Sequence, residues 1–211
     1  MVKEETYFNS LNSYEKEEYI KRLETYAKEN NVPIIMRDGF DALASVVRLK
    51  NAKKILEIGT AIGYCASRLA FLDEDIKVVT IERDEKMHAE AVKNIKDACL
   101  ENRVQIIFSD ALEVDENTLD KDFDLIFIDA AKSQYTKFFL KYEKNLKKGG
   151  VIFSDNLLFH GLVENATGEE SRNLKQMLAK IKAFNEWLSK NEDYVTTFLR
   201  IGDGVAISIK K

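Results

Sequence analysis

The fold is decided by a nine-residue stretch, Leu56-Glu57-Ile58-Gly59-Thr60-Ala61-Ile62-Gly63-Tyr64. The apolar residues up to Ile58 predict a buried strand, the glycines predict a tight turn, and a helix is expected after Gly63. Glycine lets a backbone approach a ligand closely, and open α/β sheets bind ligands at the carboxyl ends of their strands. The two glycines are four residues apart, so the motif is not G-x-G-x-x-G. Taken alone, it is also compatible with a plain tight turn.

Four further apolar runs are similar to the one that ends at Gly59. They cover residues 77–82, 104–108, 123–128 and 150–153. Near-continuous apolar runs are typical of strands in a parallel sheet that is covered on both faces. The segments Asp84–Leu100 and Tyr135–Leu146 have apolar residues at spacings of three and four, which predicts helices between the strands. This alternation indicates βαβ units with right-handed crossovers.

The two ends of the chain depart from this alternation. Helices are expected at Tyr14–Glu29 and Gly39–Leu49, and the segments Tyr194–Ile201 and Val205–Ile209 predict an antiparallel hairpin. The predicted fold class is therefore α/β: a doubly wound, mostly parallel seven-stranded sheet with N-terminal helices and a C-terminal antiparallel hairpin. We expect a single domain over residues 1–211, in which residues 1–50 form a helical cap.

Composition excludes several classes of protein. The 211 residues include 32 Lys and Arg and 36 Asp and Glu, a net charge of −4 that argues against nonspecific coating of nucleic acid. A local basic patch that docks one particular RNA stays compatible with this balance. No apolar run approaches the roughly 18 residues of a membrane span, and Met1–Glu5 lacks the apolar core of a signal peptide. Because Cys65 and Cys99 are the only cysteines, we expect no disulfide framework and a cytoplasmic location.

Two acidic residues follow the strands next to the glycine turn. Glu82 ends the run 77–82, where a carboxylate can accept hydrogen bonds from ribose hydroxyls. Asp110 follows the run 104–108 and could meet an adenine amino group. Either acid could be only a solvated strand end. Together with Gly59 they favour an adenosine pocket.

A second group of polar residues follows the last two predicted parallel strands. It contains Asp129, Lys132, Asp155 and Asn156. Two carboxylates and an amide are oxygen ligands of the kind that Mg²⁺ prefers. A cation near Lys132 would favour the neutral amine, which makes this residue a candidate general base. Either aspartate alone would more often cap a turn, but the four residues together favour a metal site.

These motifs resemble those of the cation-dependent O-methyltransferases of the catechol and caffeoyl-CoA type, which use S-adenosylmethionine. The resemblance covers nearly the whole chain, from Pro33–Met36 to Ile201–Gly204. Within this family the chain is most similar to the bacterial tRNA 5-hydroxyuridine methyltransferases. The segments that carry this similarity are Gly59–Tyr64, Thr80–Arg83, Asp129–Lys132 and Asp155–Val163.

The resemblance implies a class I, Rossmann-like methyltransferase domain and roles for individual residues. The cofactor-binding residues would be Ile35, Glu57, Gly59, Ala61, Cys65, Glu82, Asp110, Ala111 and Asp129. The ligands of Mg²⁺ would be Asp129, Asp155 and Asn156, and the catalytic residues would be Lys132, as the base, and Asp129. Substrate contacts would come from Arg37, Lys132, Asn156, His160 and Arg172. Many relatives have serine at position 65, and the thiol of Cys65 is a poorer hydrogen-bond partner.

The implied reaction transfers a methyl group from S-adenosylmethionine to the 5-hydroxyl of 5-hydroxyuridine at the wobble position of a tRNA anticodon loop, giving 5-methoxyuridine. A metal ion would lower the pKa of that hydroxyl and fix its direction, which requires two vicinal oxygens on the substrate. One alternative is methylation of a small catechol-like phenol. Another is a non-catalytic RNA-binding protein that retains only the fold, although such a protein needs none of the four residues at the metal site. The resemblance also implies a homodimer.

Three remaining residues have structural interpretations. We expect His88 at the surface of the helix 84–100 and Cys99 as a packing residue of the same helix. Trp187 should lie on the buried face of the last helix, together with Phe184 and Leu188.

Overall fold

The computed structural model describes residues 11–12 and 16–211. The N-terminal segment Met1–Glu5 and the expected helix start at Tyr14 lie outside the described residues. In the described part of the chain, no helix has the length and apolar character needed to cross a membrane.

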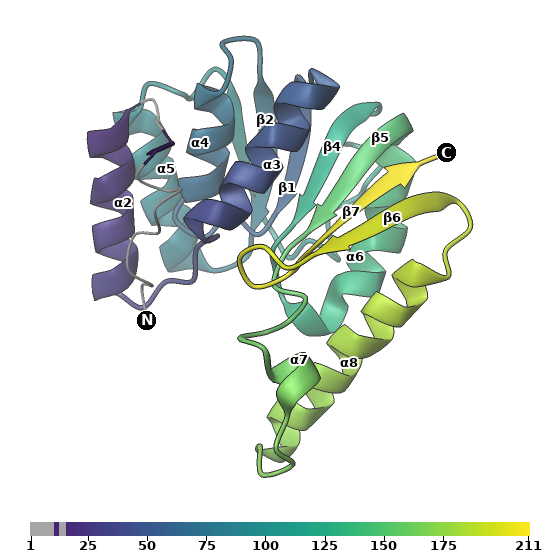
Figure 1. The fold of residues 1–211 in the computed structure, drawn as a ribbon. Coiled ribbons are helices and arrows are strands. Elements are labelled where there is room, and N and C mark those ends of the chain that lie inside the picture. The colour runs from purple at the N-terminus through teal and green to yellow at the C-terminus, as the bar shows by residue number, and fades with distance from the viewer. Residues whose placement is uncertain (1–10, 13–15) are drawn as a thin grey trace.

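Seven strands form one mixed sheet in the order β3-β2-β1-β4-β5-β7-β6 (Figure 1). The strands are β1 (Lys54–Ile58), β2 (Lys77–Glu82), β3 (Val104–Phe108), β4 (Phe123–Ile128), β5 (Leu146–Ser154), β6 (Tyr194–Leu199) and β7 (Val205–Lys210). Strands β1 to β5 pair in parallel, and β7 pairs antiparallel with both β5 and β6. The predicted doubly wound sheet with a C-terminal hairpin is confirmed.

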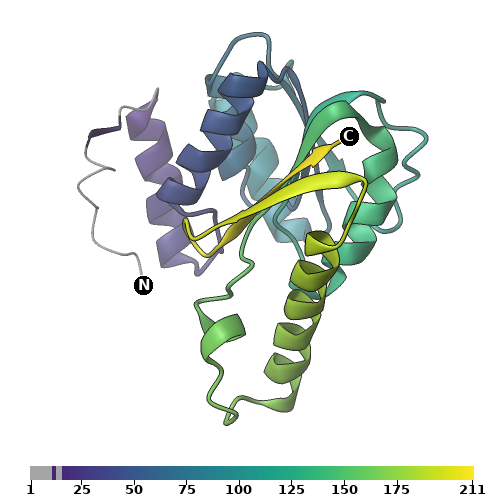
Figure 2. The same cartoon turned by 45° about the vertical axis from the view of Figure 1, so that its right-hand side comes forward.

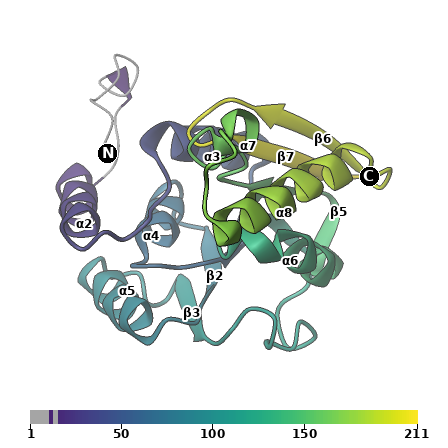
Figure 3. The ribbon, with the colours of Figure 1, turned by 90° about the horizontal axis from the view of Figure 1, so that it is seen from below.

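Helices cover both faces of the sheet. They are α2 (Glu17–Glu29), α3 (Arg37–Lys50), α4 (Tyr64–Phe71), α5 (Glu85–Asp97), α6 (Tyr135–Tyr142), α7 (Leu162–Asn165) and α8 (Arg172–Ser189), with short 3-10 turns η1 (Lys132–Gln134) and η2 (Glu143–Asn145). Side chains of α2 to α5 belong to one core, and those of α6 and α8 belong to the other. Figure 3 shows α6 and α8 side by side.

The two cores explain why the strands are apolar throughout. In β1, Ile55 packs into the core of α2 to α5, whereas its neighbour Leu56 packs into the core of α6 and α8. Both side chains are fully buried. A strand that is covered on both faces needs apolar residues at successive positions, which is the pattern in the sequence.

Some boundaries differ from those predicted. Helix α6 ends at Tyr142 rather than at Leu146, because residues 143–145 form the 3-10 turn η2. Strand β5 begins at Leu146 rather than at Gly150, because Leu146 already pairs with Phe123 of β4. Helix α3 begins at Arg37, two residues before the expected Gly39.

The interpretation of Cys99 as a helix-packing residue is wrong. Cys99 is exposed and lies beyond the end of α5 with a left-handed φ of 56°. The N–H of Leu100 bonds to the carbonyl of Ile95, and the N–H of Cys99 bonds to that of Lys96. This arrangement is a C-terminal helix cap, which requires a left-handed residue and commonly uses glycine.

The aromatic residues are placed more nearly as expected. Phe184 and Leu188 are buried, and the ring of Trp187 meets that of Phe139 edge-on at 5.1 Å between centroids. His88 is half-buried rather than fully at the surface, because its ring contacts that of Phe108 at 4.8 Å.

Helix α7 and the beginning of α8 extend beyond the carboxyl end of the sheet (Figure 2). We call residues 162–180 the arm. Helix α7 packs against α8 within it. The arm follows directly on the loop after β5, so it stands beside the sheet edge where the candidate site residues gather.

Candidate functional site

The loops after β1, β4 and β5 meet at the carboxyl edge of the sheet. Ile58 pairs with Ile128, and Ile128 pairs with the residue before Asp155, so Gly59, Asp129 and Asp155 follow neighbouring strand ends. The N–H of Asp129 donates to the carbonyl of Ile58 at 3.0 Å, and that of Asp155 donates to the carbonyl of Ile128 at 3.2 Å. The strand order reverses between β1 and β4, which is where open α/β sheets bind ligands.

Gly59 makes this close approach of the loops feasible. Its φ is 102°, and a Cβ at this position would lie 2.1 Å from the carbonyl oxygen of Asp129. Any side chain would therefore push the β1 and β4 loops apart. The sequence predicted that this glycine lets the backbone approach a ligand closely. In the structure, Gly59 allows the β1 loop to approach the β4 loop closely.

A cavity of about 250 Å³ lies at this edge. All the residues expected to bind the cofactor line it except Glu57; they are Ile35, Gly59, Ala61, Cys65, Glu82, Asp110, Ala111 and Asp129. Lys132 also lines the cavity. Several apolar wall residues were missed from the sequence, among them Met87 of α5 and Phe138 of α6. The one sequence feature that could have indicated these two residues is their position in the first two turns of a helix that follows a candidate polar residue.

Glu82 shapes the turn as well as the cavity. Its Oε2 accepts the N–H of Ala61 at 2.8 Å, and its Oε1 accepts the N–H groups of Arg83 at 2.9 Å and Asp84 at 2.8 Å. Ala61 has a left-handed φ of 47°, which is uncommon for a residue with a Cβ. The carboxylate thus holds the β1 turn in a strained conformation while it lines the cavity.

Glu57 does not line the cavity but lies next to it. Its side chain is fully buried, and its Oε2 accepts the hydroxyl of Thr80 at 2.6 Å. Among the described residues, its Oε1 has no hydrogen-bond partner. Burial raises the pKa of Glu57 to about 8 and also raises that of the neighbouring Cys65 thiol. Cys65 lines the cavity and neighbours Glu57, so this buried acid lies directly behind the cavity wall.

Asp110 is held in its charged form. Its Oδ1 accepts the N–H of Leu112 at 2.8 Å, and its Oδ2 accepts a guanidinium N–H of Arg83 at 3.1 Å. The bond from the Leu112 backbone is the main cause that lowers the pKa of Asp110, and Arg83 adds to it. A charged carboxylate in the cavity wall is suited to accept hydrogen bonds from an amino group.

The expected metal ligands and base form a compact cluster. Lys132 Nζ donates to Asp129 Oδ1 at 2.7 Å, and both side chains are mostly buried. Asp155 is only 2% exposed, and its Oδ1 accepts the N–H of Asn156, whose φ is 59°. Burial and the nearby charge of Asp129 both raise the pKa of Asp155.

This cluster fits a hard divalent cation. Within the described residues, no three His, Cys, Asp or Glu side chains are arranged around a common metal position. The set that the sequence singled out has only two carboxylates, from Asp129 and Asp155, and is completed by the amide of Asn156. A cation beside the two carboxylates would stabilise the charged form of Asp155, which burial and the charge of Asp129 disfavour. Oxygen donors alone, in this number, suit Mg²⁺ and leave positions for water or substrate.

Asp203 is a polar residue of this region that sequence reasoning missed. It is 8% exposed, and its Oδ1 accepts the N–H of His160 at 2.5 Å while its backbone carbonyl accepts the N–H of Leu158 at 2.8 Å. The β6–β7 turn thereby holds the loop that follows Asn156. An acid between two glycines in a hairpin turn was the available signal.

The expected substrate residues are not all brought together. The His160 side chain is 78% exposed, so it faces solvent near the cluster. Arg37 donates to both oxygens of Glu24 at 2.8 and 2.7 Å and to Glu17 at 3.2 Å, so its guanidinium joins α3 to α2 instead of lining the cavity. Arg172 is the first residue of α8 and belongs to the arm, away from the cavity wall.

Comparisons with known proteins identify the family of the chain. A sequence model of the O-methyltransferase family matches residues 10–211. A caffeoyl-CoA O-methyltransferase of Populus kitakamiensis is 33% identical over 171 residues, which are 78% of this chain and 73% of that protein.

Solved structures are similar over almost the whole chain. A candidate caffeoyl-CoA O-methyltransferase from Staphylococcus aureus has 46% identity and a TM-score of 0.88, covering 96% of this chain and 94% of that one. An O-methyltransferase from Bacillus cereus in complex with S-adenosylhomocysteine has 28% identity and a TM-score of 0.83, with both chains fully covered. The chain therefore belongs to the O-methyltransferase family of the caffeoyl-CoA and catechol type, and it is an S-adenosylmethionine-dependent O-methyltransferase.

Proposed function

We propose that this enzyme requires Mg²⁺ and methylates the 5-hydroxyl of 5-hydroxyuridine in the anticodon loop of tRNA. The observation that carries the metal requirement is the cluster of Asp129, Lys132, Asp155 and Asn156 beside the cofactor cavity. A methyltransferase that only had to position a neutral acceptor would gain nothing from two buried acids at neighbouring strand ends.

The chain's own residues supply binding, orientation and proton transfer. Asp129, Asp155 and Asn156 would hold the metal ion, and the cavity lined by Glu82 and Asp110 would hold the methyl donor. When bound, S-adenosylmethionine supplies an electrophilic methyl group and Mg²⁺ supplies a Lewis acid. Two protein carboxylates and one amide leave room for two vicinal oxygens of a substrate. The C5 hydroxyl and C4 carbonyl of 5-hydroxyuridine are such a pair.

Lys132 is the proposed base. Its Nζ is 2.7 Å from Asp129 Oδ1, so the amine is already directed to the place where the metal ligands gather. A metal ion held by Asp129 would take up part of the negative charge that now faces Nζ, and Lys132 would then be suited to act as a neutral amine. Nζ can then accept the proton of the substrate hydroxyl.

The arm supports a macromolecular substrate. It extends from the carboxyl edge of the sheet, next to the loop that carries Asn156 (Figure 2). Arg172 and Lys175 are exposed on it and have no salt-bridge partner among the described residues. Glu164 of the arm is paired with Arg200. This ion pair reduces the repulsion between the Glu164 carboxylate and a phosphate backbone. We extend the proposal to a tRNA partner and a homodimeric enzyme.

The metal requirement is tested with purified enzyme and tRNA that contains 5-hydroxyuridine. We expect 5-methoxyuridine, detected by nucleoside mass spectrometry, to form with Mg²⁺ and to disappear with a chelator. Asp155→Ala should abolish the metal dependence together with the activity, and Lys132→Ala should reduce the rate by about 10² to 10⁴ while S-adenosylhomocysteine still binds. Full turnover of Asp155→Ala in a chelator would overturn the metal mechanism.

A small catechol-like phenol is the second candidate substrate. It is favoured by the relationship to the Populus caffeoyl-CoA enzyme, and it offers the same two vicinal oxygens. The two candidates are separated by the tRNA of a strain that lacks this gene. Unchanged 5-methoxyuridine in that tRNA would exclude the tRNA proposal and favour the phenol.

A further inference from the structure

The loop between β3 and β4, residues 109–122, carries Asp110 and Ala111 of the cavity wall. It contains no helix or strand, and loops of this length without regular structure are commonly functional. Its first residues are ordered partly from within, because Asp110 accepts the N–H of Leu112 and its carbonyl accepts that of Glu113. These bonds hold the loop's shape but do not fix its distance from the sheet.

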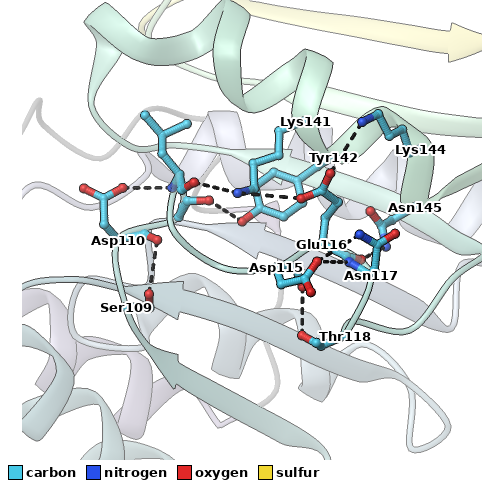
Figure 4. A network of polar contacts seen from close by, with 12 residues as sticks. Ser109, Asp110, Asp115, Glu116, Asn117, Thr118, Lys141, Tyr142, Lys144 and Asn145 are labelled. Atoms are coloured by element: carbon cyan, nitrogen blue, oxygen red, sulfur yellow. Dashed lines mark hydrogen bonds and ion pairs between the residues drawn. The ribbon is translucent and has the colours of Figure 1, made fainter.

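Beside the apolar packing of Ala111, Val114 and Leu119 in the core, polar groups at the end of helix α6 and in η2 hold this loop (Figure 4). The hydroxyl of Tyr142 donates to the carbonyl of Ala111 at 2.5 Å, and Lys141 Nζ donates to the carbonyl of Leu112 at 2.6 Å. Farther along the loop, Asn145 Nδ2 donates to the carbonyl of Glu116 at 2.8 Å. Two polar groups at the end of α6 and one in the following turn η2 therefore hold the loop's backbone.

Tyr142 is the most constrained of these groups. Its side chain is fully buried, and burial raises its pKa, so the hydroxyl stays a proton donor. It lies one helical turn after Phe138, which itself lines the cavity. Helix α6 thus supplies part of the cavity wall directly, through Phe138, and holds another part of the wall through Ala111.

We propose that Tyr142 and Lys141 are positioning residues for the adenosine part of the cofactor. Neither lines the cavity; they act by holding the carbonyls of Ala111 and Leu112, and through them the Asp110 carboxylate. Without the hydroxyl, the Ala111 carbonyl loses its buried donor and the loop is free to move outward to find water. The cavity then widens at Asp110, and the adenosine contacts are held less firmly.

The test is the affinity of Tyr142→Phe for two ligands, measured by isothermal titration. S-adenosylhomocysteine fills the whole site, whereas 5′-methylthioadenosine contains only the adenosine part. The variant loses one hydrogen bond of ordinary net strength, so we expect both dissociation constants to rise by about 3- to 10-fold. Amide exchange of Leu112 and Glu113 should become faster, since the loop they belong to is released.

Tyr194→Phe is the matched control. Tyr194 is also buried and packs against Phe139 of α6, but its hydroxyl donates to Glu143 of η2 at 3.3 Å and not to a carbonyl of the loop. We expect its two dissociation constants to stay within about twofold of the parent. Equal affinities of the two tyrosine variants would overturn the proposal, as would weaker binding of S-adenosylhomocysteine with unchanged binding of 5′-methylthioadenosine.

Lys141→Met keeps the proposal testable if Tyr142→Phe does not fold. It retains the aliphatic stem and removes the ammonium, which donates to Leu112 at 2.6 Å and pairs with Glu116 of the same loop at 3.8 Å. The same weakening of both ligands is expected, and unchanged affinities would exclude the positioning role.

Discussion

At the scale of single residues, the backbone of another loop leaves no room for a side chain at Gly59. A Cβ there would lie 2.1 Å from the Asp129 carbonyl oxygen, whereas a Cβ at Gly149, which also has a left-handed φ, would meet nothing within 4 Å. We expect Gly59→Ala to lower the free energy of unfolding by about 3 kcal/mol or more, and Gly149→Ala by about 1 kcal/mol. Urea denaturation of both variants measures this. Similar losses in the two variants would show that φ, and not the close approach, makes the glycine necessary.

Glu57 gives stability an unusual dependence on pH. Its pKa is about 8 in the folded protein, well above the value of about 4.3 expected in an unfolded chain, because it is buried. Folding therefore retains a proton that the unfolded chain releases. The stability that this carboxyl contributes is fully present below about pH 4 and is lost as the pH rises to about 8.

Glu57→Gln should remove this dependence. An amide is neutral at every pH, so the variant should gain free energy of unfolding relative to the parent, by about 1 kcal/mol per pH unit between pH 5.5 and 8. Urea denaturation without cofactor at several pH values measures the difference. A difference that stays constant over this range would contradict the buried, protonated state.

At the scale of elements, helix α2 is held by a partly buried carboxylate. Glu24 accepts two hydrogen bonds from Arg37 of α3 and one from the hydroxyl of Tyr64 of α4 at 2.7 Å. Burial alone would raise the pKa of Glu24, but the bonds from Arg37 and Tyr64 outweigh it, so the pKa is lowered. This contribution to stability is present at neutral pH and is lost as the pH falls through the folded pKa.

Glu24→Gln should therefore destabilise the docking of α2 by about 1 to 3 kcal/mol at pH 7, because hydrogen bonds to a charged group are lost. Asp97→Asn is the control, since its ion pair with Arg22 of α2 is exposed and should matter by less than about 0.5 kcal/mol. Hydrogen exchange of the α2 amides compares the two. Equal effects would mean that α2 is held by its apolar face, through Ile20 and Leu23, and not by Glu24.

Element boundaries show where sequence patterns stop being informative. The run Tyr135–Leu146 keeps helical spacing, yet the helix ends at Tyr142 because the chain must turn to bring Leu146 beside Phe123. Pairing with a distant strand decided that boundary, and no local pattern encodes it. The strands of the parallel sheet were easier to predict, because burial on both faces leaves a local apolar signal.

At the scale of the whole molecule, the arm distinguishes a tRNA substrate from a small phenol. Reversing the charge of an exposed residue on it, by Arg172→Glu or Lys175→Glu, should lower kcat/KM for tRNA by about 3- to 10-fold if either contacts phosphate. Turnover of a catechol should not change, because neither residue lines the cavity.

The control is Lys77→Glu, an equal charge change at the exposed start of β2 on the amino edge of the sheet. It should leave the kinetics of both substrates unchanged. If all three variants lose tRNA activity equally, the effect is one of net charge, and the arm is not the docking surface.

The sequence by itself determined the sheet, its C-terminal hairpin and the strand-end residues that surround the cavity. These are local signals: apolar runs give strands, and a residue at the carboxyl end of a parallel strand lies at the binding edge wherever the strand sits in the sheet. Only the tertiary structure decided which polar groups serve each other. Arg37 faces Glu24, Asp203 holds the loop after Asn156, and Tyr142 holds Ala111. Such pairings join residues that are far apart in the chain, and they depend on packing distances that no spacing in one sequence records.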